Sequence, residues 1–419
     1  MHSLGLMLDE KSIKRSRIAM YLNQLIGSFG SGLASPFLPY YAAALKFNSL
    51  EMGELQASTN LFPNLMQYFW GIISDKLGRR LIFIILGGFV SSFMFILYIF
   101  SHSPEMLISV VIVQSIFGAM VVPAWNALIG DLTSLSKRAS FIGNLSFYSN
   151  LSMLFAGLFF IVYAYLFGYS ITVYYIPFYL AGILGVLSSL IMLYAVEDRK
   201  KFVPVRKVRF LRTLGKDRDF SYFLFSQSVY NFSMAISWPL FYITTVDVLK
   251  ASFFQVGLIN LISLLFTVLF IPVFGRMIDR YGPRNFMILT RFLFVPVPLV
   301  YGISNSIIWI YMLNALTGFT TAITNVAFLA YLLDVAPRED RGKYIGIYNA
   351  ILGVVTFFGS LIGGALAQFL QLYYSLVISL LIVYLISFSG RLTGAILFLR
   401  IKEKRKYPEK MTFRLNLFH

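Results

Sequence analysis

Several amide and aromatic side chains lie inside long apolar segments of this chain, where they could form hydrogen bonds with a solute. Gln24 and Gln227 are the leading pair, because they occupy corresponding positions in the two halves of the sequence. An amide that faces lipid is costly, so such side chains are expected to point into the protein. The other candidates for substrate binding are Asn23, Gln114, Trp125, Asn126, Tyr230, Asn231, Trp238 and Asn314. This set suits a neutral, polar or amphipathic solute, and hydrogen bonding between helices is the alternative for each residue.

Acidic side chains and His are missing from the centres of the apolar segments. Glu54, about one helical turn from the outer end of its segment, is the candidate for proton coupling, and a water-exposed position at the mouth is the alternative. Arg291 and Arg391 do fall within apolar segments, and we expect their long side chains to extend to the nearby cytoplasmic surface, with substrate contact as the alternative. The sequence has no Cys, and its three His lie in termini or a loop, so we expect no metal site and no cofactor.

The elements that carry these residues are predicted to be membrane-spanning helices. Of the 419 residues 58% are hydrophobic and 13% are charged, whereas soluble domains are about 45–50% apolar and about 25% charged. A spanning helix needs about 20 apolar residues. Twelve such runs are present, at 18–44, 52–74, 81–101, 106–130, 141–168, 172–196, 219–248, 253–277, 285–303, 306–333, 343–370 and 373–399. A membrane β-barrel would show short alternating segments instead, so the predicted fold class is an all-α membrane protein with twelve transmembrane helices.

Lys and Arg residues fall almost entirely on one side of this predicted arrangement. Only Lys46 and Lys250 lie in connections on the other side. The positive-inside rule therefore places both termini in the cytoplasm, and we expect a multi-pass protein of the cell membrane. The net charge of +17 follows from this topology and does not indicate nucleic-acid binding, which would need a basic face on a soluble module. The basic segments 199–218 and 400–414 are candidates for binding anionic lipid headgroups, although topology alone explains them.

The two halves of the chain are similar to one another. The pairs aligned by a shift of 203 to 204 residues include Gln24 with Gln227, Pro36 with Pro239, and Lys46 with Lys250. Each half carries six predicted spans, an even number, so both halves would insert in the same orientation. The predicted domains are a six-helix bundle at 1–198, a basic cytoplasmic linker at 199–218, and a second six-helix bundle at 219–419 that ends in a basic tail.

A charged loop motif also occurs twice. Its first copy, GIISDKLGRR, contains Gly71, Asp75, Lys76, Gly78 and Arg80, and its second copy, GRMIDRYGPR, contains Gly275, Asp279, Arg280, Gly282 and Arg284. Farther along each half, Asp131 and Arg138 are matched by Asp334 and Arg341. With six plus six spans and a basic central loop, the whole chain resembles the major facilitator superfamily. The resemblance implies two bundles that rock about a central cavity lined by helices 1, 4, 7 and 10, in a protein that can work as a monomer.

We interpret the repeated motif as a cytoplasmic latch that closes when the two bundles come together. Asp75 is expected to lie near the positive N-terminus of helix 11, and Arg79 is expected to pair with Asp131. Such contacts would favour the outward-open state. The alternative is that these residues only anchor tight turns at the membrane surface, with Gly78 and Gly282 supplying φ > 0.

The second copy of the latch is predicted by the duplication. Asp279 would face the start of helix 5, and Arg280 or Arg284 would lie near Asp334. Pro283 stands at the position that corresponds to Arg79. Because proline carries no charge, the second latch is expected to be weaker than the first.

Together these features favour a transporter of a small organic solute. A drug or amphiphile exporter of the multidrug type is the alternative, and a transporter-like membrane sensor or scaffold is a further one. Drug–proton antiporters of the family that the chain resembles usually carry Arg four residues before a Gly on helix 4, and here Gln114 precedes Gly118. The segments VEDRKK and IKEKRK also differ from those of sugar porters. No enzyme is expected, because no catalytic groups cluster at membrane depth.

Overall fold

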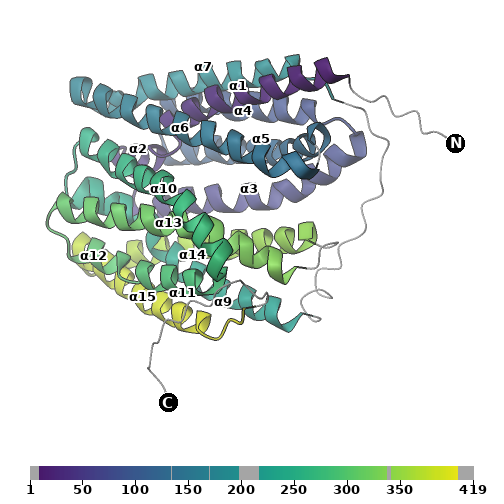
Figure 1. Ribbon diagram of the computed structural model, residues 1–419. Coiled ribbons are helices and arrows are strands. Elements are labelled where there is room, and N and C mark those ends of the chain that lie inside the picture. Colours follow the sequence, from purple (N-terminus) through teal and green to yellow (C-terminus); the bar gives the residue numbers. More distant parts are fainter. Residues whose placement is uncertain (1–8, 134, 169, 198–216, 337–340, 404–419) are drawn as a thin grey trace.

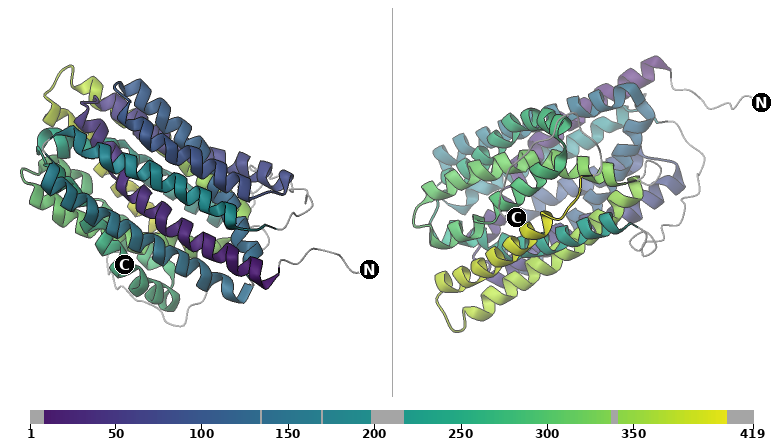
Figure 2. Two further views of the ribbon diagram at one scale, coloured as in Figure 1. Left: turned by 90° about the horizontal axis from the view of Figure 1, so that it is seen from above. Right: turned by 60° about the horizontal axis from the view of Figure 1, so that its bottom comes forward.

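The chain folds into long helices that run alongside one another (Figures 1 and 2). The computed structural model describes residues 9–133, 135–168, 170–197, 217–336 and 341–403, with the side chains of 75, 135–140 and 341–343 excepted. The helices of the first half are α1 (Glu10–Ala34), α2 (Leu38–Ala44), α3 (Ser49–Leu77), α4 (Leu81–Ile99), α5 (Pro104–Leu132), α6 (Leu135–Phe167), η1 (Ile171–Tyr174), α7 (Tyr175–Ile191) and η2 (Met192–Tyr194). Those of the second half are α9 (Arg218–Ile243), η3 (Thr244–Val248), α10 (Phe253–Tyr281), α11 (Pro283–Phe294), α12 (Val297–Ile303), α13 (Ile307–Val335), α14 (Arg341–Leu370) and α15 (Leu376–Phe398).

Every predicted span falls on one of these helices or on two or three successive helical elements, which confirms the all-helical membrane fold. Nine helical segments within the described ranges are long and apolar enough to cross a membrane. The spans outside that group are α1, α3 and α9, which carry polar residues such as Gln24, Asn64 and Gln227. Their polarity suits helices that face the interior of a bundle rather than lipid.

Proline residues account for two of the breaks. The first predicted span turns at Ser35–Phe37 between α1 and α2, where Pro36 cannot donate a helical hydrogen bond. The ninth span breaks between α11 and α12, where Pro296 and Pro298 follow one another closely. Pro239 lies inside α9 and does not end it. The helix continues to Ile243 and is followed directly by the π-helical turn η3.

The duplication seen in the sequence is present in the backbone. Among the described residues, positive φ occurs at Lys46 and Lys250 and at Gly78 and Gly282, and each pair is separated by 204 residues. The values for Gly78 and Gly282 are 60° and 85°, which confirms the positive φ that the tight-turn interpretation expected of both glycines. Both α3 and α10 also begin with a reciprocal capping box, formed by Asn48 with Glu51 and by Ser252 with Gln255.

Buried apolar residues form one core that joins the two halves and two cores that do not. We call the end of the molecule that carries Lys46 and Lys250 the outer end, and the end that carries Arg80 and Arg284 the basic end. The shared core lies toward the outer end and includes Phe37 with Phe160 from the first half, together with residues of α9 and α10 from the second. Toward the basic end each half has a separate core of its own. In Figure 1 the first half, purple to blue, lies above the green to yellow helices of the second.

The two bundles approach most closely where α3 meets α14 near the outer end. A Cβ atom added to Gly53 would lie 2.7 Å from the main-chain oxygen of Ser360 and 3.0 Å from the Cα of Gly364. Gln371 donates a hydrogen bond of 2.7 Å to the hydroxyl of Ser49 on the opposite bundle. The two helix backbones are therefore in contact, and only glycine fits at this crossing.

Further contacts close the outer end. Lys46, after α2, forms an ion pair with Asp247 in η3 of the other bundle. The rings of Tyr165 on α6 and Phe254 on α10 pack edge to face, with their centroids 5.7 Å apart. The sequence placed Lys46 on the side with few cations, and the structure shows that it bridges the two halves there.

Toward the basic end the same helix pairs separate. A Cβ atom added to Gly143 on α6, Gly275 on α10 or Gly346 on α14 would meet no described neighbour within 4 Å. The contact of α14 with α3 is still close at Gly353, where the added atom would lie 2.6 Å from the Cβ of Asn64. The bundles are thus joined at the outer end and apart at the basic end.

Substituting Gly364 with valine should open the outer end. Overpacking typically costs about 1–3 kcal/mol, so the opened population should rise about fivefold or more. Because the sequence has no Cys, maleimide labelling of a single cysteine introduced at Ser360, which is 0% exposed, measures this opening. The matched control is Gly346→Val, in open space at the basic end of the same helix. Equal labelling of Ser360→Cys in both backgrounds would contradict the role of the close crossing.

Candidate functional site

A cavity of about 460 Å³ lies mainly in the second bundle. Four of the predicted substrate-binding residues line it, namely Gln227, Asn231 and Trp238 on α9 and Asn314 on α13. Tyr40 on α2 is the contribution of the first bundle to the lining. Its ring packs edge to face against Tyr242 at a centroid distance of 4.9 Å, which brings the closed outer end to the edge of the cavity.

Gln227 uses its amide within the protein. Its Nε2 donates a hydrogen bond of 2.6 Å to the hydroxyl of Tyr348 on α14, and its Oε1 accepts one of 2.8 Å from Arg291 on α11. The side chain of Asn231 donates to the main-chain oxygen of Gln227 at 2.8 Å. Gln227 is only 1% exposed, so it lines the cavity as the centre of a hydrogen-bond network.

The expected location of the two arginines is wrong. Arg291 is 3% exposed and Arg391 is 1% exposed. Both line the cavity of the second bundle instead of extending to the cytoplasmic surface. Polar acceptors and aromatic rings inside the bundle hold them, with the Arg291 guanidinium 4.1 Å from the centroid of the Phe328 ring. Long cationic side chains extend to the interface only where the bundle offers nothing closer.

A smaller cavity, of about 340 Å³, lies in the first bundle. Gln24 on α1 and the adjacent Trp125 and Asn126 on α5 line it together. Gln24 donates a hydrogen bond of 3.1 Å to Ser28, which in turn shares one of 2.8 Å with Ser149 on α6. Seven of the predicted substrate-binding residues therefore lie at one cavity or the other.

Three candidates lie within the packing of a single bundle. Asn23 donates a hydrogen bond of 2.7 Å to the main-chain oxygen of Ser188 on α7. Gln114 on α5 donates one of 2.9 Å to Ser91 on α4. Tyr230 is 0% exposed, and its hydroxyl donates to the main-chain oxygen of Arg291 at 3.0 Å. In these three residues the polar group bonds to a neighbouring helix of the same bundle, as expected if it stabilises helix packing and does not bind substrate.

Glu54 lies in the second turn of α3 and is half-buried. The hydroxyl of Ser58 donates to its main-chain oxygen at 2.8 Å. Its side chain lines neither of the two cavities described above. A role of Glu54 in proton coupling stays a prediction.

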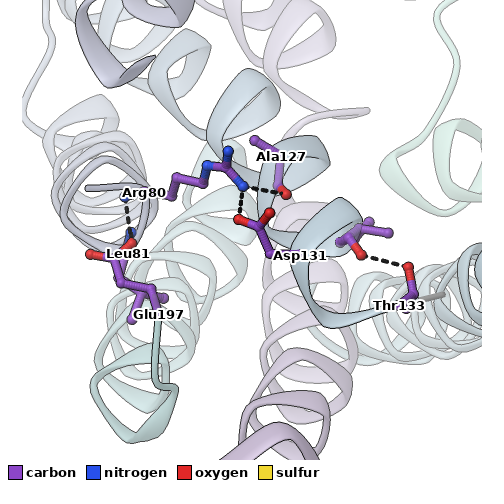
Figure 3. A network of polar contacts seen from close by, with 7 residues as sticks. Arg80, Leu81, Ala127, Asp131, Thr133 and Glu197 are labelled. Carbon is purple, nitrogen blue, oxygen red and sulfur yellow. Dashed lines mark hydrogen bonds and ion pairs between the residues drawn. The ribbon is translucent and has the colours of Figure 1, made fainter. Parts of the chain in front are cut away.

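At the basic end of the first bundle, Arg80 forms the charged contact that was predicted for Arg79. Figure 3 shows the Arg80 guanidinium paired with Asp131 at the end of α5 and hydrogen-bonded to the main-chain oxygen of Ala127 at 2.6 Å. Arg79 is exposed. The expected pairing of Arg79 is wrong, because the left-handed turn at Gly78 places Arg80, the residue next to the start of α4, against α5.

Glu197, after the last helix of the first bundle, caps the start of α4. Its carboxylate accepts a hydrogen bond of 2.8 Å from the main-chain N–H of Leu81 and another from that of Arg80 (Figure 3). A negative charge at a helix N-terminus is stabilising. Glu197 lies in the segment VEDRKK, and its capping role was not predicted from the sequence.

The second bundle repeats the arrangement with Glu403 and Arg284. The carboxylate of Glu403 accepts a hydrogen bond of 3.3 Å from the main-chain N–H of Arg284 at the start of α11. Burial raises the pKa of the Glu403 carboxyl, and this hydrogen bond opposes the shift. The Arg284 guanidinium donates to the main-chain oxygen of Leu399 at 2.9 Å, so it holds the end of α15. The predicted proximity of Arg280 or Arg284 to Asp334 stays a prediction.

The remaining parts of the latch are only partly described. The side chains of Asp75, Arg138 and Arg341 lie outside the described residues. Lys76 and Asp279 are exposed at the basic ends of α3 and α10. Both motif glycines that precede the acids, Gly71 and Gly275, have no close contact within 3.5 Å of an added Cβ atom in the described structure. The latch itself therefore stays a hypothesis.

The two similar bundles consist of helices long enough to cross a membrane, and each bundle contains a polar cavity. This is the architecture of a multi-pass membrane transporter. The family model of the Major Facilitator Superfamily matches the chain twice, at residues 20–221 and 220–415. The chain therefore belongs to the Major Facilitator Superfamily, as its resemblance implied.

Curated relatives and solved structures agree with this assignment. An uncharacterised MFS-type transporter of Methanocaldococcus jannaschii is 24% identical over 372 residues, covering 85% of this chain and 92% of the relative. The quinolone resistance protein NorA of Staphylococcus aureus is 25% identical over 357 residues, covering 83% and 88%. A point mutant of the nucleoside transporter NupG superposes with a TM-score of 0.72 at 15% identity, covering 92% of this chain and 99% of that structure. A bacterial homologue of the lysosomal transporter Spinster, inward-facing and unoccupied, superposes with a TM-score of 0.68 at 14% identity, covering 94% and 99%.

Replacing Arg80 with alanine should destabilise the protein far more than replacing Arg79. The Arg80 and Asp131 side chains are 21% and 13% exposed, so losing their contact should cost about 1.5–3 kcal/mol, the range for hydrogen bonds to charged groups. Arg79→Ala, in an exposed side chain of the same turn, is the matched control and should change stability little. Thermal unfolding in detergent measures both, and equal shifts would argue against the assignment of Arg80.

Proposed function

We propose that this chain moves a small organic solute across the cell membrane by alternating access, with the two bundles rocking about a central site. The observation that carries the proposal is the distribution of contacts between the bundles. One apolar core joins them at the outer end, and separate cores fill each bundle at the basic end. With the basic end in the cytoplasm, this is the arrangement expected of an inward-facing state.

The position of the cavities supports the same proposal. Both are lined by helices that begin or end at the separated basic end, and polar groups in each face the interior. A volume of about 460 Å³ lies within the range of about 300–1,000 Å³ that is typical of small-molecule sites. The inward-facing, unoccupied Spinster homologue offers a solved fold of the same kind.

Export of drugs or amphiphiles is the second candidate. The likeness to the quinolone resistance protein NorA, which extends over 83% of this chain, favours it. Aromatic side chains such as Trp238 and Phe241 in the cavity of the second bundle suit a substrate with a planar apolar body. A membrane sensor or scaffold without transport activity is the remaining alternative, and we propose no enzymatic activity.

We further propose that both termini are cytoplasmic and that the protein works as a monomer. The basic segments 199–218 and 400–414 would then face the inner leaflet, where they would bind anionic lipid headgroups. Most of these two segments lies outside the described residues.

Locking the outer end should stop transport reversibly. Lys46→Cys and Asp247→Cys, at the ion pair that bridges the bundles, can be joined by a short bifunctional thiol reagent that a reductant cleaves. A screen of thermal stability against sugars, amino acids, organic acids, lipophilic cations and amphiphiles supplies the solute, since a ligand at 10 times its Kd adds about 1.4 kcal/mol.

Counterflow of that solute into proteoliposomes then measures the effect of the lock. We expect flux to fall to background on crosslinking and to return on reduction. The matched control is the single variant Lys46→Cys treated in the same way. Undiminished flux through the crosslinked protein would contradict alternating access, because the outer end would have remained shut.

A further inference from the structure

We infer that the cavity of the second bundle binds an organic anion that carries a ring, and that Arg291 contacts its negative group. This inference rests on the proposed transport function and names a substrate class for it. It replaces the neutral solute that the amide residues favoured. The argument comes from the charges in the cavity, from their partners and from the side chains around them.

The cavity carries positive charge that the protein does not neutralise. Arg291 and Arg391 both line it, and its described lining contains no Asp or Glu. Guanidinium groups stay protonated in proteins, so two full charges lie in the interior of the bundle. Charged groups at membrane depth are costly and usually mark the path of a substrate or an ion. Some compensation for these charges is therefore required.

The hydrogen bonds of Arg391 account for its own charge. Its guanidinium donates to the main-chain oxygen of Phe294 at 3.0 Å and to that of Met234 at 3.3 Å. It also donates to the hydroxyls of Ser237 at 2.7 Å and Ser387 at 3.2 Å. The Phe294 carbonyl would normally bond to the N–H of residue 298, which is proline and has none. Arg391 thus holds together the break between α11 and α12 and is a structural residue.

Arg291 is not satisfied in this way. Its described acceptor is the Oε1 atom of Gln227, at 2.8 Å, and the rest of its guanidinium lies over the rings of Tyr230 and Phe328 at 4.4 and 4.1 Å. Its Nε atom is buried and has no hydrogen-bond partner in the described structure. An orphaned charged donor is expensive inside a protein. It gives a ligand oxygen a donor that is already desolvated and oriented.

The network around Arg291 fixes its position. Gln227 links it to Tyr348 on α14, so three helices that meet at the cavity hold one guanidinium. A preorganised donor loses little conformational entropy when it binds a ligand. Gln227 is accordingly a positioning residue in this account.

The other walls of the cavity indicate what accompanies the negative charge. Trp238, Phe241 and Tyr301 present aromatic surface, and the rings of Phe241 and Tyr301 stack with their centroids 4.2 Å apart. One unpaired donor, the Arg291 Nε, suits a single carboxylate better than a phosphate, which would call for several donors. A carboxylate attached to a planar ring would therefore match both the positive charge of Arg291 and the aromatic surface of the cavity.

Three probes of nearly equal shape test the sign of the charge. Benzoate, benzamide and benzylamine share a ring and differ in being anionic, neutral and cationic at pH 7. Calorimetric titration of the detergent-purified wild-type protein should give a Kd for benzoate that is lower than that for benzamide by about tenfold or more, the effect expected of a charge-assisted hydrogen bond. Benzylamine should bind more weakly still.

Variants then test the residue. Arg291→Met should abolish the preference for benzoate over benzamide, and Arg291→Lys, which keeps the charge but loses the planar fork, should retain part of it. The matched control is Arg276→Met, which removes one exposed positive charge from α10 and should leave the preference unchanged. If Arg291→Met does not fold, the comparison of the three probes on the wild type and the Arg291→Lys result remain decisive.

Equal affinity for benzoate and benzamide, preference for benzylamine, or no binding of benzoate would overturn the inference. So would an unchanged preference in folded Arg291→Met protein. None of these results touches the proposed transport function, which is tested by the reversible lock on whichever solute the stability screen identifies. Failure of the lock with intact benzoate selectivity would instead remove the transport cycle and leave an anion-binding membrane protein.

Discussion

The crossing of α3 with α14 near the outer end is the contact on which the arrangement of the two bundles depends. Gly53 and Gly364 let the helix backbones touch, and in a membrane such close packing replaces the hydrophobic driving force that water would supply. The aromatic contact of α6 with α10 lies toward the same end. With the contacts gathered there, the bundles can separate at the basic end while they remain one molecule.

A second constraint, that buried polar groups need partners, shapes the interior of each bundle. In the second bundle, the prolines that break α11 from α12 free main-chain carbonyl groups, and Arg391 binds one of them. At the basic ends, Glu197 and Glu403 supply acceptors to the first N–H groups of α4 and α11. Three buried side-chain atoms of the described residues have no such partner, namely Ser74 Oγ, Gln368 Oε1 and Arg291 Nε. Arg291 is the charged group among them, and the inferred anion site follows from that difference.

The repeated features of the fold were predictable from sequence because they depend on local chemistry. Apolar runs of sufficient length locate the helices, and Gly78 and Gly282 mark the turns that need positive φ. Gln24 with Asn126, and Gln227 with Asn314, line cavities as expected of polar residues on central helices. The sequence could not show which of two adjacent arginines, Arg79 or Arg80, contacts Asp131. Arg80 rather than Arg79 pairs with Asp131 because of how one turn directs two adjacent side chains.

The burial of the arginines was also beyond sequence reasoning. Distance along the chain places Arg291 and Arg391 within reach of the basic end, but their acceptors come from α9 and from the break between α11 and α12. The pairing of Lys46 with Asp247 joins residues about 200 positions apart and depends on how the two bundles meet. Such contacts follow from tertiary structure and leave no local pattern.

The measurement that tests the account most directly is the distance between the bundles at both ends of one protein. Spin labels on Gly143→Cys and Gly275→Cys report on the basic end, and labels on Tyr165→Cys and Phe254→Cys report on the outer end, with no native cysteine to interfere. In lipid nanodiscs, addition of transported solute should shorten the first distance and lengthen the second. Distances that stay fixed at both ends, or that change in the same sense, would contradict two bundles rocking about a central site.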